Sequence, residues 1–524
     1  MERSGLSLAD WVVVAIYLAA VLAVGLRAAG RQRSVRDYFL GDRSLPWWAV
    51  ALSIIATETS AATYIGTPGT AYRGSWAFLQ MILGFIAARV FLAAFVLKIF
   101  YRAEVVTVYG FLQQRFGEVV RVIAAVLFLC GRVVGSGVRL YAACIALQVA
   151  AGWAGDGATL AAIAVLGTIA LAYTLLGGIK AVVWTECILG TTFLVGGIVA
   201  AVCILAQIPG GPSAIERLPD FGEKLRIFHW APADGAGWWQ STQLFWTGFG
   251  GGFVLTLATH GTDQDMVQRM LTCSNWRQGG ASLLASAALL LPMNVVFLSV
   301  GSLLFFLHRL LPESQPAGVT NEDHYFLHFI AGRMAPGLAG LVLAGLFAAA
   351  VSSHTSVLNA LASTSIADFY RPHLRPGRSE EHYLAASRAF TAFWGIVLIV
   401  VAAAFIGSAE NILTTALGAL TYFYGSLLGV FVLGIFTRRG SQMSAAAGML
   451  ASVPVVLLLQ AREFIATPER APSAVQAALR ALPEGITGLV TECVPRLAWP
   501  LWIVAGTAVS LGIGLLGRSP PRDR

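Results

Sequence analysis

Charged side chains within long apolar stretches are the residues of this chain that most need a chemical role. Glu58 lies in one such stretch, and Arg132 and Arg139 lie in another. A charge at the centre of a lipid bilayer costs at least about 2.5–3.5 kcal/mol, so each of the three needs a partner or a function. The arginines are seven residues apart, which puts them on one helix face, about 10 Å apart along the axis. Both can therefore face the same cavity.

Two interpretations of these charges are open. In the first, one arginine binds a solute carboxylate through two parallel hydrogen bonds, and Glu58 binds an amine or hydroxyl of that solute. Arg139 is slightly favoured for this role because it follows the small residues at 135–137, which leave room for a ligand. In the second, the intramembrane arginines, which include Arg89 in the span 76–101, pair with Glu58 or Glu186 inside a helix bundle and only stabilise it.

Two apolar stretches are interrupted at matching places by small residues, helix breakers and polar side chains. They read SIIATETSAATYIGTPGT (Ser53 to Thr70) and GFGGGFVLTLATHGTDQD (Gly248 to Asp265). Backbone that is not helical survives at membrane depth only where protein covers it or where it lines a cavity. A broken helix in each half of a two-repeat bundle is typical of the substrate and ion site of a transporter. The first stretch is expected to unwind near Ala56 and Thr59.

The composition indicates an integral membrane protein. Of the 524 residues, 57% are hydrophobic and only 12% are charged, whereas a soluble domain carries about 25% charged residues. A spanning helix needs about 20 apolar residues. Windows of that size predict about 13 transmembrane helices, at 8–26, 45–67, 76–101, 122–150, 157–176, 179–207, 241–270, 281–310, 336–369, 382–405, 412–436, 442–459 and 497–516.

The two broken helices divide the chain into two repeats if they are equivalent. The first repeat then covers 45–207 and the second covers 241–436, with five spans each. Because five is an odd number, the second repeat enters the membrane from the opposite face, which is the inverted arrangement that serves alternating access. The helix at 8–26 and the two helices in 442–516 are then peripheral. The predicted fold is all-α, with a single transmembrane domain over 1–524.

Basic residues predict the orientation in the membrane. Most of them lie in segments that follow odd-numbered spans, for example Arg36, Arg115, Arg269 and Arg371. By the positive-inside rule, the N-terminus is expected outside the cell and the C-terminus in the cytoplasm. This distribution explains the net charge of +8. Nucleic acid is not an expected partner, because the basic residues do not gather on one soluble face.

Four segments resemble, in this order along the chain, the sodium:solute symporter family. They are DYFLGDRSLPWWAVALSIIATETSAATYIG (Asp37 to Gly66), LLGGIKAVVWTECILG (Leu175 to Gly190), DQDMVQRML (Asp263 to Leu271) and LFAAAVSSHTSVLNALASTSIADFY (Leu346 to Tyr370). The resemblance covers nearly the whole chain. It implies the LeuT-type fold, a 5+5 inverted repeat with discontinuous helices. It also implies a plasma-membrane protein that carries a small organic solute into the cell with sodium, and not an enzyme.

The family's main sodium site maps onto five positions of this sequence. They are Ala56 and Thr59 at the first break, and Ala349, Ser352 and Ser353 in the span 336–369. Unwound backbone carbonyls bind sodium in such transporters, and helix positions i and i+3 or i+4 share a face. The alternative is that the two serines bond to carbonyls of their own helix or join it to a neighbour.

Glu186 is the candidate for a second ion site or a coupling acid. The family has an aspartate at this position, and some members use it for a second sodium ion together with hydroxyls that Thr355 and Ser356 could supply here. The extra methylene of glutamate displaces the carboxylate. Glu186 could instead neutralise a neighbouring arginine or tune the first site. A single sodium ion is favoured.

The predicted solute-binding residues come from both broken helices and from the span 122–150. They are Glu58, Thr63, Arg132, Arg139, Thr256, Thr259 and His260, of which the last three are expected within the break of the second helix. The family's usual Tyr-Trp pair is absent there, which disfavours a stacked sugar ring. The arginines favour a carboxylate-bearing or zwitterionic solute. Possible gate residues are Tyr64, Phe78, Gln80, Tyr422 and Tyr424.

Two other functions are kept as alternatives. A proton could replace sodium by using Glu58 or Glu186, or the chain could be a transporter-like sensor that moves no cargo. The sensor is disfavoured because the sequence shows no cytoplasmic effector domain. The expected partners are Na+, a small organic solute and the lipid bilayer, and the chain is expected to be a monomer.

Overall fold

The structure is a computed structural model that describes residues 6–29, 34–153, 155–232, 237–406, 412–468 and 473–518. These residues form helices and no β-strand, which confirms the all-α prediction. Eight of the described helices are long and apolar enough to cross a membrane, or nine if one bent pair is counted as a single span. The number of 13 spans stays a prediction.

The main helices follow one another along the whole chain. They are α1 (Leu8–Ala29), α3 (Trp47–Glu58), α4 (Ala61–Arg73), α5 (Phe78–Phe91), α8 (Glu118–Ala151), α9 (Asp156–Leu205), α12 (Phe245–Gly261), α13 (Gln264–Leu271), α14 (Trp276–Leu310), α16 (Leu338–Thr364), α17 (Glu380–Ala403), α18 (Ile412–Phe436), α19 (Gln442–Ala466) and α22 (Pro500–Leu516).

Short helices and turns connect them. They are α2 (Val35–Leu40), η1 (Gly41–Arg43), η2 (Leu92–Val96), α6 (Leu97–Arg102), α7 (Tyr109–Phe116), α10 (Gly211–Glu216), α11 (Phe221–Lys224), η3 (Trp238–Gln240), η4 (Pro312–Ser314), η5 (Glu322–His324), α15 (Tyr325–Arg333), η6 (Ser365–Leu374), α20 (Ser473–Arg480) and α21 (Glu484–Cys493).

The first broken helix unwinds where the sequence predicts it. Helix α3 ends at Glu58, Thr59 and Ser60 leave the helical conformation, and α4 begins at Ala61. The two halves are bent by 61°. The N–H of Ser60 bonds to the carbonyl of Glu58 at 3.1 Å, so the break releases the carbonyl of Ala56 from its regular helical partner.

The second broken helix unwinds later than predicted. Helix α12 continues to Gly261, and Asp263 starts α13 as its N-cap by accepting a hydrogen bond from the backbone of Asp265. Thr256, Thr259 and His260 therefore lie in the last turns of α12 and not within the break, which corrects the prediction. The reason is local: a capping carboxylate sets the start of a new helix, whereas the glycines before it are accommodated within α12.

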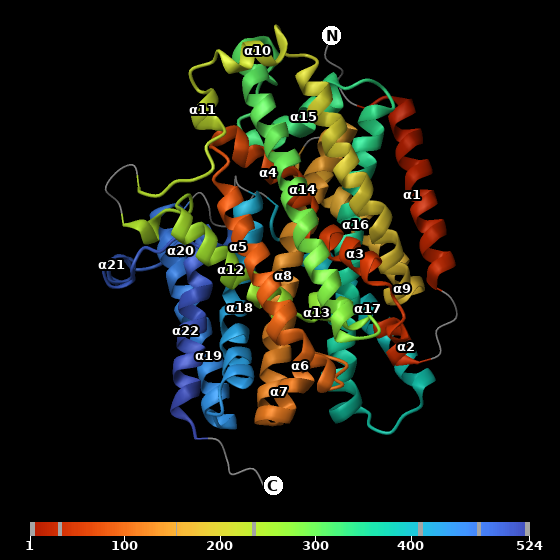
Figure 1. Cartoon of the computed structure of the whole chain (residues 1–524), viewed down its shortest axis with the longest axis vertical. Helices are drawn as coiled ribbons and strands as arrows, with labels where there is room; N and C mark the ends of the chain where they lie inside the picture. Colours follow the sequence, from red (N-terminus) through yellow and green to blue (C-terminus); the bar gives the residue numbers. More distant parts are fainter. Residues whose placement is uncertain are drawn as a thin grey trace.

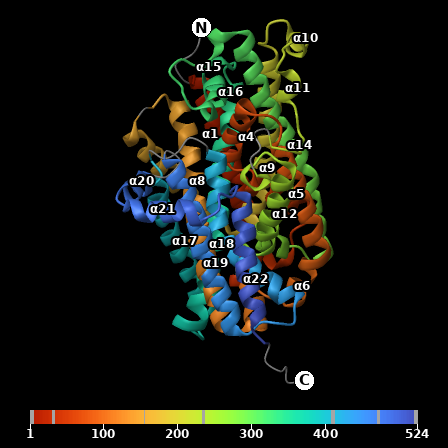
Figure 2. The same cartoon turned by 90° about the vertical axis from the view of Figure 1, so that its left-hand side faces the viewer.

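The elements are arranged so that short connecting segments gather at the two ends of the bundle. In Figure 1, α10, α11 and α15 lie at the upper end, and α7 lies at the lower end. The turned view in Figure 2 shows the same separation between α10 and α11 above and α6 below. Helices α10 and α11, between α9 and α12, thus lie at the same end as α15, which stands between α14 and α16.

A kinked helix holds Glu186 inside the bundle. The predicted spans 157–176 and 179–207 correspond to the two parts of α9, which are joined without a loop at Gly178, where the backbone is not helical (φ 59°, ψ −178°). A positive φ is adopted at little cost only by glycine. The part of α9 after the kink packs against α3 and α16, which puts its polar residues beside the first broken helix.

Candidate functional site

A cavity lies where the two broken helices meet α8. Its volume is about 800 Å3 when the open space at its mouth is counted, and all seven predicted solute-binding residues line it. Apolar side chains complete the wall, among them Phe85 of α5 and Leu290 of α14. A mostly apolar pocket with a few convergent polar groups is typical of a small-molecule site.

Glu58 faces this cavity with its charge already compensated. Its carboxylate forms an ion pair with Arg89 of α5, which is completely buried, while 20% of the Glu58 side chain is exposed. Arg89 also donates to the hydroxyl of Ser286 at 2.9 Å. The structural interpretation of these charges therefore fits Glu58.

Arg132 is compensated in the same way, by acids that follow the second break. Its guanidinium pairs with Asp265 and lies 3.3 Å from the carboxylate of Asp263. Tyr424 of α18 donates a hydrogen bond to Asp263. Sequence reasoning did not single out the two acids. The signal was present, because two carboxylates stand two residues apart at the end of an apolar span.

Arg139 differs from the other intramembrane arginines because no carboxylate of the described residues forms an ion pair with it, whereas Arg89, Arg132 and Arg269 are all paired with acids. Its Nη1 atom is buried and has no hydrogen-bond partner among the described residues, although the side chain lines the cavity. The Nε atoms of Arg89 and Arg132 also have no hydrogen-bond partner among the described residues. A guanidinium has five N–H donors and no acceptor, and an unsatisfied buried donor costs about 1–3 kcal/mol. Arg139 is therefore suited to receive an acceptor from outside the protein.

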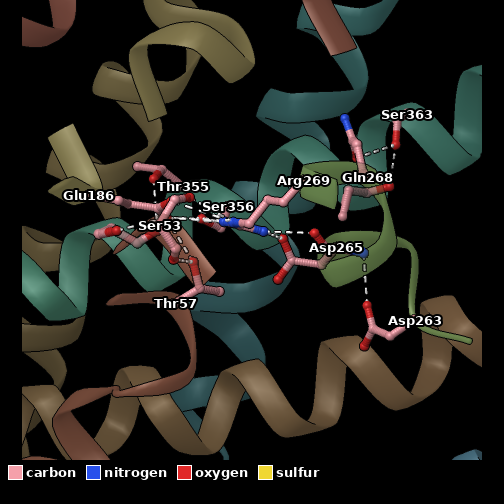
Figure 3. Close-up of polar contacts among 12 residues, drawn as sticks. Ser53, Thr57, Glu186, Asp263, Asp265, Gln268, Arg269, Thr355, Ser356 and Ser363 are labelled. Atoms are coloured by element: carbon pink, nitrogen blue, oxygen red, sulfur yellow. Dashed lines mark hydrogen bonds and ion pairs between the residues drawn. The ribbon is translucent and has the colours of Figure 1, made fainter. Parts of the chain in front are cut away.

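A second polar cluster surrounds Arg269, as Figure 3 shows. The sequence placed this arginine among the cytoplasmic loop charges, but it is completely buried on α13. It contacts Glu186 at 3.0 Å, Asp265 and the hydroxyl of Ser356, and its Nε donates to Ser53 at 3.1 Å. Helices α3, α9, α13 and α16 meet at this one guanidinium, and its pairing with two carboxylates explains why it is buried.

Glu186 is the acceptor at the centre of the same cluster. Besides Arg269, it accepts hydrogen bonds from four hydroxyl groups, which belong to Ser53, Thr57 (2.9 Å), Ser352 (2.9 Å) and Ser356. Ser356, one of the two hydroxyl residues considered for a second ion, thus accepts a hydrogen bond from the guanidinium of Arg269. The hydroxyl of Thr355 donates to the carbonyl of Ser352 in its own helix.

The residues expected to bind sodium lie on α16, at the end of α3 and in the first break, and α16 packs against both α3 and α4. Ser352 and Ser353 are buried, with 2% and 4% of their surface exposed. The hydroxyl of Ser353 has no hydrogen-bond partner among the described residues, and the break releases the carbonyl of Ala56. Thr59 lies in the break itself and lines the cavity. Ala349 falls on α16, outside the residues whose side chains the structure describes.

Of the possible gate residues that are described, Phe78 lines the cavity and three others do not. Tyr64 is buried in an aromatic cluster, at 4.8 Å from the ring of Phe193. Gln80 donates to the carbonyl of Gln243 at 2.7 Å, and Tyr424 bonds to Asp263. The side chain of Tyr422 lies outside the described residues.

Comparison with known proteins identifies the family. The family model described as the sodium:solute symporter family matches residues 38–452. The chain belongs to this family. Its relatives include the sodium/sialic acid symporter NanT of Aliivibrio fischeri, which is 30% identical over 87% of this chain and 88% of the relative. The sodium-dependent multivitamin transporter of Oryctolagus cuniculus is 30% identical over 99% of this chain and 85% of the relative.

A solved structure confirms the fold class of this symporter. The substrate-bound outward-open state of a Na+-coupled sialic acid symporter matches with a TM-score of 0.82 and 24% identity, over 97% of each chain. The symporter is thus a multi-pass membrane protein that couples transport of a solute to sodium, and it is not an enzyme.

Proposed function

We propose that this symporter carries a carboxylate-bearing organic solute into the cell together with one sodium ion. The observation that supports the carboxylate most directly is Arg139, whose Nη1 has no hydrogen-bond partner among the described residues, beside a cavity where Glu58 and Arg132 are already paired. The relatives point in the same direction, because NanT is named for sialic acid, a sugar that bears a carboxylate.

The formal charges around the cavity support one cation and one anion. The cluster formed by α8, α9 and α13 contains three carboxylates, of Glu186, Asp263 and Asp265, and two guanidinium groups, of Arg132 and Arg269. It therefore has one negative charge in excess. Arg139 contributes one positive charge beside it. Sodium near Ser352, which bonds to Glu186, would neutralise the cluster, and a carboxylate would neutralise Arg139.

Sodium is proposed to bind the five oxygens expected from the sequence. Support comes from the unpartnered hydroxyl of Ser353 and from the released carbonyl of Ala56, since oxygen atoms freed at a break are the ligands sodium finds in such folds. A second sodium beside Glu186 is disfavoured, because Arg269 places its own positive charge against Glu186 and Ser356.

The location follows from the basic residues and the family. We infer a monomer in the plasma membrane with its N-terminus outside and its C-terminus in the cytoplasm. Single cysteines placed in α10 and in α7, at the two ends of the molecule in Figure 1, test this orientation. The α10 cysteine should react with an impermeant maleimide added to whole cells, and the α7 cysteine should react only after lysis.

The carboxylate assignment is tested by thermal-shift and uptake measurements on the purified, reconstituted protein. Sialic acid, lactate, proline and glucose serve as probes, each with sodium and with choline. Arg139→Met should weaken binding of the carboxylate probes by about 30-fold or more, and Arg139→Lys should restore only part of it because lysine lacks the planar fork. Stabilisation by glucose alone would remove the assignment.

The sodium site is tested by the double substitution of Ser352 and Ser353 by alanine. This variant should reach the membrane but lose sodium-stimulated uptake. Ser363→Ala is the matched control, because Ser363 lies on the same helix and bonds to Gln268 and Ala360. Retained sodium stimulation in the double variant contradicts the assignment.

Uptake against pH, with sodium replaced by choline, separates sodium coupling from proton coupling. Glu58 forms an ion pair with Arg89, and Glu186 forms one with Arg269. Each carboxylate therefore already has a positive partner inside the protein, which disfavours either as a proton carrier. Uptake that persists in choline and rises as the external pH falls would support the proton instead.

A further inference from the structure

A small side chamber adjoins the main cavity. It lies between the first break, α8 and α16, measures about 250 Å3 when the open space at its mouth is counted, and its wall includes Ser136, Ser353 and His354. Ser60 and Arg139 line both spaces. A ligand in the main cavity can therefore place one group in the chamber without leaving the rest of the site.

Three buried polar atoms of the chamber wall have no hydrogen-bond partner among the described residues. They are Nη1 of Arg139, Oγ of Ser353 and Nε2 of His354, and His354 is only 3% exposed. Native proteins pair nearly all buried polar atoms, so an unpaired set needs an explanation such as a ligand. Three such atoms around one space indicate a binding site.

The chemistry of the wall selects the ligand group. Arg139 can only donate, and serine and histidine can each donate one hydrogen bond. The carboxylates near the cavity, Glu58 and Asp265, are paired with arginines elsewhere, so the chamber itself holds a positive charge and an excess of donors. A group that only accepts and carries a negative charge is complementary to it.

We propose that His354 is a solute-recognising residue and that the chamber holds the carboxylate of the solute. One carboxylate oxygen accepts from Arg139, and the other accepts from Nε2–H of His354. The inference rests on the proposed function and deepens it, because it assigns the carboxylate to a defined chamber and names a second residue that selects it.

Ser353 links the chamber to the sodium ion. Its oxygen has lone pairs for sodium and its proton is free for the carboxylate, so one hydroxyl serves both ligands. A bound cation polarises the O–H bond and strengthens the hydrogen bond that it donates. Solute and sodium then raise each other's affinity by the same factor, as linkage requires.

The test compares three substitutions of His354 in the purified full-length protein. Glutamine places an N–H near the position of Nε2, asparagine is too short to do so, and leucine offers no donor. The probes are sialic acid, lactate and the neutral amide lactamide, titrated with sodium and with choline. Leu140→Met, a change in the apolar wall of the same chamber, controls for altered packing.

We expect wild-type protein in sodium to prefer lactate over lactamide. His354→Leu and His354→Asn should weaken lactate and sialic acid binding roughly 10- to 100-fold, the effect of losing a hydrogen bond to a charged group. His354→Gln should stay within a few-fold of wild type. The sodium dependence of carboxylate binding should weaken in parallel, whereas Leu140→Met should leave preference and linkage in place.

The outcomes separate this inference from the proposed function. If Arg139→Met abolishes carboxylate binding while all His354 variants keep the wild-type preference and sodium linkage, the chamber assignment alone is wrong. If the wild type binds neither carboxylate, both proposals fall. Should the leucine variant not fold, the difference between asparagine and glutamine decides, and equal affinities of these two overturn the inference.

Discussion

Arg269 and Glu186 show how buried charges are held in this symporter. The arginine contacts two carboxylates and two hydroxyls, and Glu186 accepts from four hydroxyls as well as from Arg269. Removing one member of a buried ion pair leaves the other without compensation and costs about 3–5 kcal/mol. The two members are not equivalent, because the cluster has one carboxylate more than it has arginines.

Substitution of the two residues should therefore have different effects. Arg269→Met leaves three carboxylates with one arginine, and we expect a stability loss of about 3–5 kcal/mol, seen as a large fall in melting temperature in detergent. Glu186→Gln removes the excess negative charge, so it should fold but bind sodium more weakly. Equal destabilisation by both variants contradicts the charge argument.

His324 is a titratable residue outside the membrane whose neutral form the fold requires. It ends η5, next to Asp323, which pairs with Arg73 of α4 at 2.8 Å. Burial, and then the positive charge of His328, lower the pKa of His324 to about 4. In the unfolded chain the pKa of histidine is about 6.5, so the unfolded state binds more protons between these values.

Stability should fall as the pH is lowered through this window. The contribution of neutral His324 to the free energy of unfolding is fully present above about pH 6.5. It is lost as the pH falls towards 4, and the loss amounts to up to about 3 kcal/mol. The melting temperature of wild-type protein should drop more steeply between pH 6.5 and 4.5 than that of His324→Gln. His373→Gln, at an exposed histidine, is the control and should follow the wild type.

At the scale of elements, α5 and α12 pack closely because glycines face the neighbouring backbone. A Cβ atom on Gly84 would lie 2.2 Å from the carbonyl oxygen of Phe249, and one on Gly252 would lie 2.5 Å from that of Met81. Small residues permit such close helix contacts in membranes. The contact joins α5 to one half of the second broken helix, so it positions the cavity wall.

A methyl group at this contact should separate the two helices. We expect Gly84→Ala to lower the melting temperature and the rate of uptake, because backbone atoms cannot move aside as a flexible side chain can. Gly250→Ala is the matched control on α12, since a Cβ atom there meets nothing within 4 Å. A Gly84→Ala variant that matches this control would show that the helices can adjust.

For the whole molecule, the proposed stoichiometry fixes how transport responds to membrane potential. One sodium ion with a monocarboxylate adds no net charge, whereas one sodium ion with a zwitterion adds one positive charge. A potential of 100 mV is worth about 2.3 kcal/mol per charge, which corresponds to about 50-fold in accumulation. The two classes of solute should therefore behave differently in the same vesicles.

Proteoliposomes with a potassium diffusion potential measure this difference. With the interior negative, accumulation of lactate should be unchanged, and accumulation of proline, if it is carried, should increase. Lactate uptake that responds to the potential would indicate a second sodium ion and would contradict the role given to Arg269.

The residue pattern along the chain determined the membrane class, the place of the first break and most of the polar residues that line the cavity. The length of apolar stretches, helix breakers and intramembrane charges are local properties of the sequence. Because unpaired backbone polar groups are costly in lipid, these properties indicate where helices span the membrane and where they break. For the same reason Glu58, Arg132, Arg139 and His260 could be named before the structure was seen.

Only the tertiary structure decided which charges are paired. Arg132 and Arg139 have the same chemistry and face the same cavity, but α13 brings Asp263 and Asp265 to the first and leaves Nη1 of the second without a partner. Arg269 looked like a loop charge because one of its two carboxylate partners, Glu186, is 83 residues away in sequence, although the other, Asp265, lies four residues away on the same helix. Most of these pairs join side chains of different helices. The spacing of residues along one helix does not reveal how far they lie from residues of another helix.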